Sequence, residues 1–213
     1  MIKQKKSSNT YINREVSWLQ FNARVLQEAD DETVPLIERL RFLGIFSNNL
    51  DEFFKVRYAT VKRIVEAGKG GKSELGGIKA NELLDLITQI VIKQQSDSLD
   101  ILSKIQKKLE KEHIFFINEK QVQPDQHDFI KNYFIQHVSP ALVTIILSDS
   151  VKLPNLIDSA SYLAVKLELH SGDNRYALIE ISKSMNRFVV FPELLGNNYI
   201  MMLDDLLRYC LHD

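Results

Sequence analysis

Residues 41–57, RFLGIFSNNLDEFFKVR, place apolar side chains at the three- and four-residue spacing of a helix. The centre of this segment carries Ser47, Asn48 and Asn49. These small polar residues weaken a helix interior because their side chains compete for backbone hydrogen bonds. The two asparagines could cap a break in the helix, fill a polar gap between helices or hold a ligand. This segment alone is compatible with all three interpretations.

The flanking residues predict two consecutive helices. Ser17 and Gln20 have the form of a capping box at the start of a short amphipathic helix. Pro35 suits the first position of the second helix, whose apolar spacing persists for about 32 residues, or roughly 48 Å. We expect one long helix here. If this helix is bent or capped a second time, we expect it at residues 47–49, since Asn49 and Glu52 have the three-residue spacing of a capping box.

Residues 68–77 contain five glycines and interrupt the helical pattern. A second long pattern, at near-heptad spacing, follows over residues 84–109. Two long helices joined by a flexible loop should pack antiparallel, with the short first helix against them. The sequence therefore predicts an antiparallel bundle of three helices, two of them long, as an N-terminal domain at residues 1–112.

The second half of the chain has a different pattern and predicts an α+β domain at residues 113–213. Residues 161–181 alternate between apolar and polar on both sides of a turn, which is typical of an antiparallel hairpin. Shorter apolar runs and capping signals predict further strands at residues 114–118, 187–193 and 199–203, and helices beginning near Pro124 and Asp204. We expect an antiparallel sheet in a domain that is truncated on its C-terminal side. The overall fold class is α+β.

The composition excludes several classes of protein. The 213 residues carry 27 basic and 28 acidic side chains, so the net charge of −1 provides no general attraction for nucleic acid. The only cysteine, Cys210, excludes an internal disulfide framework and suits a reducing, cytoplasmic compartment. No run approaches the roughly 18 apolar residues of a transmembrane helix, and no apolar segment follows the basic start as it would in a signal peptide.

Motifs for catalysis and for metal binding are not found. Residues 66–73, EAGKGGKS, end like a phosphate-binding loop, but Glu66 replaces the first glycine and the preceding segment is helical. None of the histidines has the spacing of a metal site or follows a nucleophile motif. They are His113, His127, His137, His170 and His212. We therefore predict no catalytic residue and no metal ligand in this chain.

Basic residues surround the asparagine pair in the sequence. On a helix such residues usually form a solvated face, paired here with Glu38, Asp51 and Glu52, and an anion-binding role is the alternative. They are Arg39, Arg41, Lys55, Arg57, Lys62 and Arg63.

Residues 14–63 resemble the start of the polyphosphate kinase family that works through a phosphohistidine. The likeness rests on Glu15, Ser17-Trp18-Leu19, Phe21-Asn22, RVLQE and PLIERLRFLGIFSNNLDEFFKVR. The second half is also similar to that family's head domain, in IFFINEK, SYLAVKLEL, RYALIEI and LDDLLRYCLHD. The likeness covers nearly the whole chain.

The resemblance implies an enzyme that reversibly transfers the γ-phosphate of ATP to polyphosphate with magnesium and a phosphorylated histidine. It implies that the histidine and the magnesium site lie in C-terminal catalytic domains, outside this chain, so that the fragment alone is inactive. The implied partners are ATP or ADP, polyphosphate, those C-terminal domains and a second copy bound through the head domain. The implied location is cytoplasmic, peripheral to the inner membrane.

The resemblance also implies a role for Asn49, because the second asparagine of the family's SNN motif contributes to the ATP site. An asparagine amide offers a donor and an acceptor together, which suits the edge of adenine. The alternative to a kinase fragment is a non-catalytic helical interaction module that kept this sequence without the chemistry.

Overall fold

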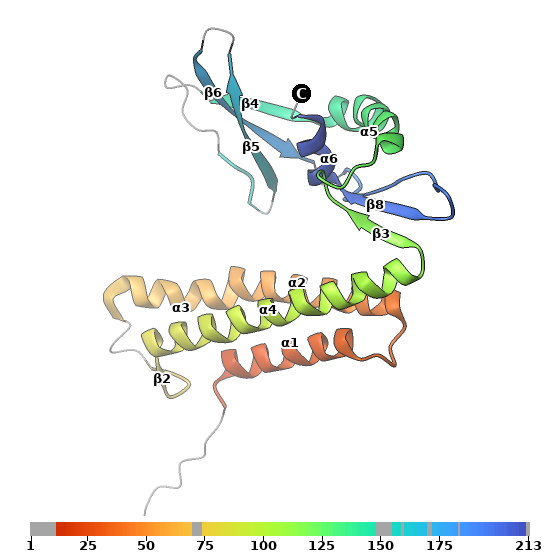
Figure 1. The fold of residues 1–213 in the computed structure, drawn as a ribbon. Coiled ribbons are helices and arrows are strands. Elements are labelled where there is room, and N and C mark those ends of the chain that lie inside the picture. The colour runs from red at the N-terminus through yellow and green to blue at the C-terminus, as the bar shows by residue number, and fades with distance from the viewer. Residues whose placement is uncertain are drawn as a thin grey trace, which may run out of the picture. The chain divides into compact units, whose positions relative to one another are not determined.

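The computed structural model describes residues 12–69, 74–147, 155–158, 160–169, 172–182 and 184–211. The chain divides into two compact units, Met1–Leu109 and Glu110–Asp213 (Figure 1). Long helices dominate the first unit, and the second combines helices with two three-stranded sheets. This confirms the α+β class. The domain boundary after residue 112 and the truncation of the second domain stay predictions.

The first unit contains α1 (Arg14–Asp30), α2 (Leu36–Phe53), α3 (Ala59–Ile64) and α4 (Ala80–Lys111). A π-helical turn, Phe54–Tyr58, joins α2 to α3, and the backbone stays helical on both sides of it. The expected bend or second cap at residues 47–49 is therefore wrong, because α2 runs through both asparagines without a break. A second π-helical turn, Val65–Lys69, follows α3 and includes Gly68 with a φ of 70°.

Helix α1 is capped by Asn13 and not by the expected Ser17. Asn13 Oδ1 accepts hydrogen bonds from the backbone N–H groups of Glu15 and Val16, while Asn13 Nδ2 donates to the carbonyl of Leu75. Leu75 belongs to a short hairpin of β1 (Glu74–Leu75) and β2 (Ile78–Lys79) that precedes α4. A contact 62 residues away therefore holds the capping side chain in place, and this explains why local sequence pointed to the wrong residue.

The turn of this hairpin provides a test of that contact. Gly76 and Gly77 both have positive φ, and a Cβ on Gly76 would lie 2.9 Å from Asn13 Nδ2, whereas a Cβ on Gly77 would meet nothing within 4 Å. We expect Gly77→Ala to cost about 1 kcal/mol from backbone strain and Gly76→Ala to cost about 1 kcal/mol more through the displaced cap. Urea unfolding of both variants measures the difference. Equal losses would contradict the role of Asn13.

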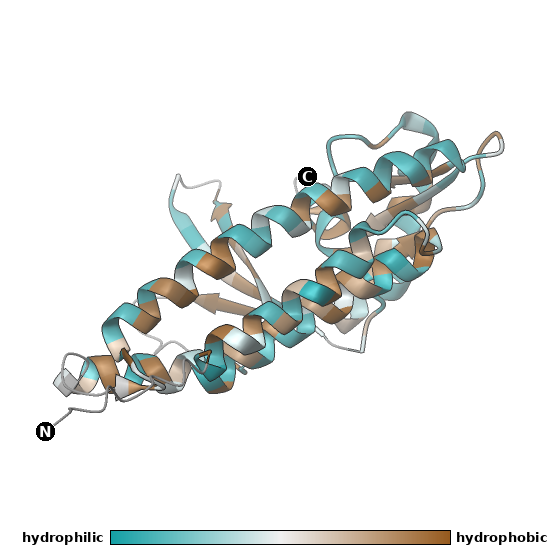
Figure 2. Ribbon diagram, turned by 90° about the horizontal axis from the view of Figure 1, so that it is seen from below, coloured by the Kyte–Doolittle hydropathy of each residue, from teal (hydrophilic) through white to brown (hydrophobic). Residues whose placement is uncertain are grey.

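Helix α4 is tied to α1 and to the residues after it by contacts between distant parts of the chain. Gln94 Nε2 donates to the carbonyl of Leu19 at 2.9 Å. Lys104 Nζ pairs with Asp30 at 2.9 Å and Lys108 Nζ with Glu32 at 2.6 Å. Figure 2 shows apolar residues in brown recurring between polar residues in teal along the long helices. The described apolar residues that become buried are Leu19, Leu26, Ala29, Phe46, Leu50, Phe53, Val61, Ala80, Leu83, Ile87, Val91, Ile101, Ile105 and Leu109.

The second unit holds two separate sheets. Its helices are α5 (His127–Tyr133), extended at both ends by 3₁₀- and π-helical turns, and α6 (Leu203–Cys210). One sheet has the order β4 (Val143–Leu147), β6 (Asn174–Ile181), β5 (Ser161–Glu168), all antiparallel, which confirms the hairpin predicted at residues 161–181. The other has the order β3 (Ile114–Ile117), β8 (Asn198–Met202), β7 (Phe188–Val190).

Two features of these sheets differ from the expectation. Strands β3 and β8 run parallel, with Ile114 opposite Asn198, although an antiparallel sheet was expected. Strand β4 was not predicted, because periodicity alone does not distinguish a short continuous apolar run from a buried helical segment. The core of this unit consists mainly of Ile130, Val138, Ile181, Val189, Phe191, Met201, Leu203, Leu206 and Leu207.

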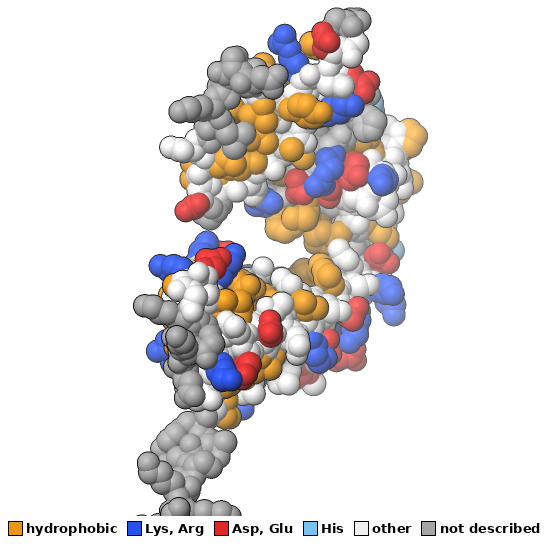
Figure 3. Space-filling view, turned by 90° about the vertical axis from the view of Figure 1, so that its left-hand side faces the viewer, with side chains coloured by type: hydrophobic (Ala, Val, Ile, Leu, Met, Phe, Trp, Pro, Cys, Tyr) orange, Lys and Arg blue, Asp and Glu red, His pale blue; other side chains and the backbone are white. Residues whose placement is uncertain are grey.

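Exposed apolar side chains occur on every strand of the antiparallel sheet. They include Val143 and Ile146 of β4, Leu167 of β5 and Tyr176 of β6. Figure 3 shows apolar side chains in orange at the surface of the second unit. Among the helices that the structure describes, none has the length and apolar character needed to cross a membrane.

Candidate functional site

A cavity of about 330 Å³ lies beside Asn49 in the first unit. Asn49 is half-buried and lines it, whereas Asn48 is exposed and is not among the lining residues. The two asparagines therefore face different surroundings, as expected for neighbouring side chains that point about 100° apart on a helix. The cavity is lined by Arg14 and Trp18 of α1, by Asn49, Glu52 and Phe53 of α2, and by Val56 and Arg57 of the π-helical turn that follows α2.

Aromatic rings form one wall of the cavity. The rings of Trp18 and Phe53 are stacked, with centroids 5.0 Å apart and planes inclined by 25°. Phe53 is 1% exposed and belongs to the core, while Trp18 is half-buried. The cavity therefore combines an aromatic wall with four polar or charged side chains, those of Arg14, Asn49, Glu52 and Arg57.

Asn49 is also part of a hydrogen-bonded chain between helices. Asn49 Nδ2 donates to Asn22 Oδ1 at 3.1 Å, and Asn22 Nδ2 donates to the backbone carbonyl of Phe46 at 3.2 Å. Asn22 is 0% exposed, so this chain crosses the interior between α1 and α2. Of the three interpretations of the asparagine pair, Asn49 thus fills a polar gap between helices. Contact with a ligand stays a prediction.

Charged groups of both signs lie at the same cavity. Glu15 Oε1 lies 3.4 Å from Arg14 Nε and 3.8 Å from Arg57 Nη1. The second distance is too long for a hydrogen bond, and the buried Arg57 Nη1 has no hydrogen-bond partner among the described residues. Arg57 Nη1 therefore has an ion-pair partner in Glu15 but makes no hydrogen bond within the described residues.

The structure does not gather the other basic residues around Asn49. Arg39 is buried and contacts the end of α1, while Arg41 pairs with Glu38 and Lys55 with Asp51 on the exposed helix surface. Of the six, only Arg57 lines the cavity, and Arg14 joins it from α1. Sequence reasoning missed Arg14 because its position depends on how α1 packs against α2, and the local pattern carries no signal for that.

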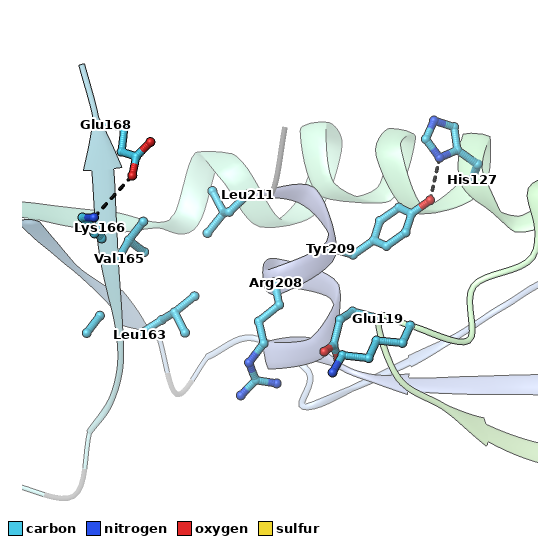
Figure 4. Close-up of a pocket in the computed structure, with 11 residues that line it drawn as sticks. Glu119, His127, Leu163, Val165, Lys166, Glu168, Arg208, Tyr209 and Leu211 are labelled. Atoms are coloured by element: carbon cyan, nitrogen blue, oxygen red, sulfur yellow. Dashed lines mark hydrogen bonds and ion pairs between the residues drawn. The ribbon is translucent and has the colours of Figure 1, made fainter. Parts of the chain in front are cut away.

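A larger cavity of about 1000 Å³ lies in the second unit, but many of its polar groups are already paired (Figure 4). His127 Nδ1 lies 2.7 Å from the Tyr209 hydroxyl, and Lys166 pairs with Glu168. Arg208 pairs with Asp204 and with Asp205, a carboxyl whose pKa is raised by burial and by the nearby charge of Asp204. These pairs are already formed without a ligand in the cavity.

Within the described residues, no three or more His, Cys, Asp or Glu side chains lie close enough to hold a metal ion. His113 Nδ1 lies 3.0 Å from Asn197 Oδ1, and the ring of His137 contacts Tyr133. His170 and His212 lie outside the described residues.

Comparisons with known proteins give a consistent result for both units. Residues 11–117 match the family model described as polyphosphate kinase N-terminal domain, and residues 125–213 match the polyphosphate kinase middle domain. The chain is 42% identical to polyphosphate kinase from Vibrio cholerae over 210 residues, and 40% identical to that from Escherichia coli K12 over 210 residues. These matches cover 95% of this chain and 29% and 30% of those relatives.

A solved structure is also similar. The crystal structure of polyphosphate kinase from Porphyromonas gingivalis matches with a TM-score of 0.80 and 29% sequence identity. The match covers 96% of this chain and 30% of that chain. The chain thus spans less than a third of the length of these proteins.

Proposed function

The chain belongs to the polyphosphate kinase family, and we propose from this that it forms the N-terminal part of an enzyme that transfers the γ-phosphate of ATP reversibly to polyphosphate. Matches to two consecutive domains of that family, over residues 11–117 and 125–213, carry the proposal. The relatives continue well beyond the matched part, since the chain covers only 29% of the Vibrio cholerae protein. The catalytic steps are therefore assigned to the rest of the enzyme.

The first unit contributes to the ATP site through the cavity beside Asn49. The volume of about 330 Å³ is large enough for a nucleobase, and Trp18 supplies a half-buried aromatic face. Asn49 meets the edge of the adenine, and Arg14 and Arg57 line the same cavity. The support for this site is that Asn49, the asparagine of the family's SNN motif, lines the same cavity as Trp18 and Arg57.

The rest of the enzyme supplies the metal and the phosphorylated histidine. The described histidines contact other side chains: His113 contacts Asn197, His127 contacts Tyr209 and His137 contacts Tyr133. The second unit contributes to assembly of the dimer, which its exposed apolar side chains on β4, β5 and β6 support. The enzyme acts in the cytoplasm, where ATP is available, at the surface of the inner membrane.

This division of labour predicts that residues 1–213 alone make no polyphosphate. Phosphoryl transfer in this family needs positioned positive charge and a histidine nucleophile, which we assign to the C-terminal domains. The measurement is incorporation of labelled phosphate from ATP into polymer and into protein, for the full-length enzyme and for residues 1–213 side by side. Polymer made by residues 1–213 would contradict the division, and a full-length enzyme that makes none would contradict the function.

A further inference from the structure

The orientation of the Asn49 amide follows from the backbone carbonyl at the other end of its hydrogen-bonded chain. The backbone carbonyl of Phe46 can only accept a hydrogen bond, so Nδ2 of Asn22 must be the atom that faces it. Asn22 Oδ1 then faces Asn49, and only Nδ2 of Asn49 can donate to it. The backbone of α2 therefore fixes both amides in one of their two orientations.

This orientation determines which atom of Asn49 is presented to the cavity. Asn22 is fully buried and does not line the cavity, whereas Asn49 does. With Nδ2 turned toward Asn22, the carbonyl oxygen Oδ1 is left on the other side of the same planar group. Within the described part of the chain, this Oδ1 makes no hydrogen bond. A ligand in the cavity therefore meets the acceptor Oδ1, with the second N–H of Nδ2 as the remaining donor of the same amide.

We propose that Asn22 is a positioning residue that holds Asn49 as a hydrogen-bond acceptor, so that the cavity prefers a purine with an amino group at position 6. Adenine carries a donor at that position, and hypoxanthine carries a carbonyl oxygen. An oxygen facing Asn49 Oδ1 would set two acceptors against each other, and turning the amide would break its bond to Asn22. This inference rests on the proposed ATP site and names the atom of Asn49 that the base contacts.

Gln94 offers a matched control in the same helical bundle. Like Asn22 it is a buried amide, 7% exposed, that donates to a backbone carbonyl of a neighbouring helix. Its partner is Leu19, and it has no hydrogen bond to Asn49. Replacing Gln94 with methionine therefore removes a comparable buried hydrogen bond without freeing the Asn49 amide.

The test compares ATP with inosine triphosphate as phosphate donors for the full-length enzyme. The measured quantity is the ratio of kcat/KM for the two nucleotides. Asn22→Leu is expected to lower the preference for ATP about three- to tenfold, as for one neutral hydrogen bond, with kcat at saturating ATP retained. Asn22→Ala, which introduces no larger side chain, is the second variant should the leucine variant fail to fold.

The outcomes separate this inference from the proposed function. Gln94→Met should keep the wild-type preference even if it melts earlier, and a loss of preference equal to that of Asn22→Leu would overturn the positioning role. The same role is overturned if Asn49→Leu lowers the preference while Asn22→Leu and Asn22→Ala do not. If Asn49→Leu changes neither the preference nor the KM for ATP, the proposed ATP site itself is wrong.

Discussion

Asn49→Asp in the full-length enzyme is expected to raise the KM for ATP about tenfold or more. The carboxylate adds a negative charge to the cavity that we propose receives an anionic nucleotide, and it removes the Nδ2 donor that bonds Asn22. One neutral hydrogen bond is worth about 1 kcal/mol net, an unfavourable charge costs more, and about 1.4 kcal/mol is tenfold in affinity. ATP-dependent kinetics measured together with melting temperatures check this result.

Asn48→Asp is the control, because Asn48 is exposed and does not line the cavity. From sequence alone, Asn49→Asp is a nearly isosteric change that should leave folding almost intact. The structure predicts that it also lowers the melting temperature, because aspartate cannot donate to Asn22 Oδ1. A normal KM for ATP with only a lower melting temperature would show that Asn49 is purely structural.

Arg39→Met is expected to reduce the free energy of unfolding by about 3 kcal/mol. Arg39 is 2% exposed, and its guanidinium donates to the carbonyls of Ala29 at 2.7 Å and Asp30 at 3.3 Å. These carbonyls lie at the C-terminal end of α1, where the helix presents unpaired acceptors and partial negative charge. Methionine fills a similar volume but leaves these acceptors without their charged donor. Urea unfolding of the chain measures the loss.

Arg41→Met provides the comparison for this prediction. Arg41 lies two residues further along α2, and its exposed side chain pairs with Glu38 at the surface. Exposed ion pairs contribute about 0.2–1 kcal/mol, so we expect a loss of well under 1 kcal/mol. Similar losses for the two variants would mean that the buried contacts of Arg39 do not stabilise the end of α1.

The features that the sequence predicted correctly are those that depend on local periodicity. The spacing of apolar residues along α2 and α4, and the alternation in β5 and β6, follow from burying one face of each element. The errors occur where a distant contact decides the structure. Asn13 caps α1 because Leu75 holds its side chain, and β3 pairs with β8 across more than 80 residues of chain.

The candidate site was predictable only in part for the same reason. The sequence motif identifies Asn49, but the orientation of its amide depends on Asn22 and Phe46. Arg39 appeared to be one of several surface cations, and its burial is visible only after α1 and α2 have packed. A pattern along one helix cannot show which of its polar residues will meet another helix.

The contacts between α4 and the α1 region have a consequence for the order of events during protein synthesis. The bonds of Gln94 to Leu19, of Lys104 to Asp30 and of Lys108 to Glu32 join residues 74 to 76 positions apart. At about 5–20 residues per second, a ribosome needs roughly 4–15 s to make the missing partner. During that time α1 and α2 can pair with each other, but the face that α4 will cover is open to water. The apolar part of that face stays uncovered until about residue 110 has emerged from the exit tunnel.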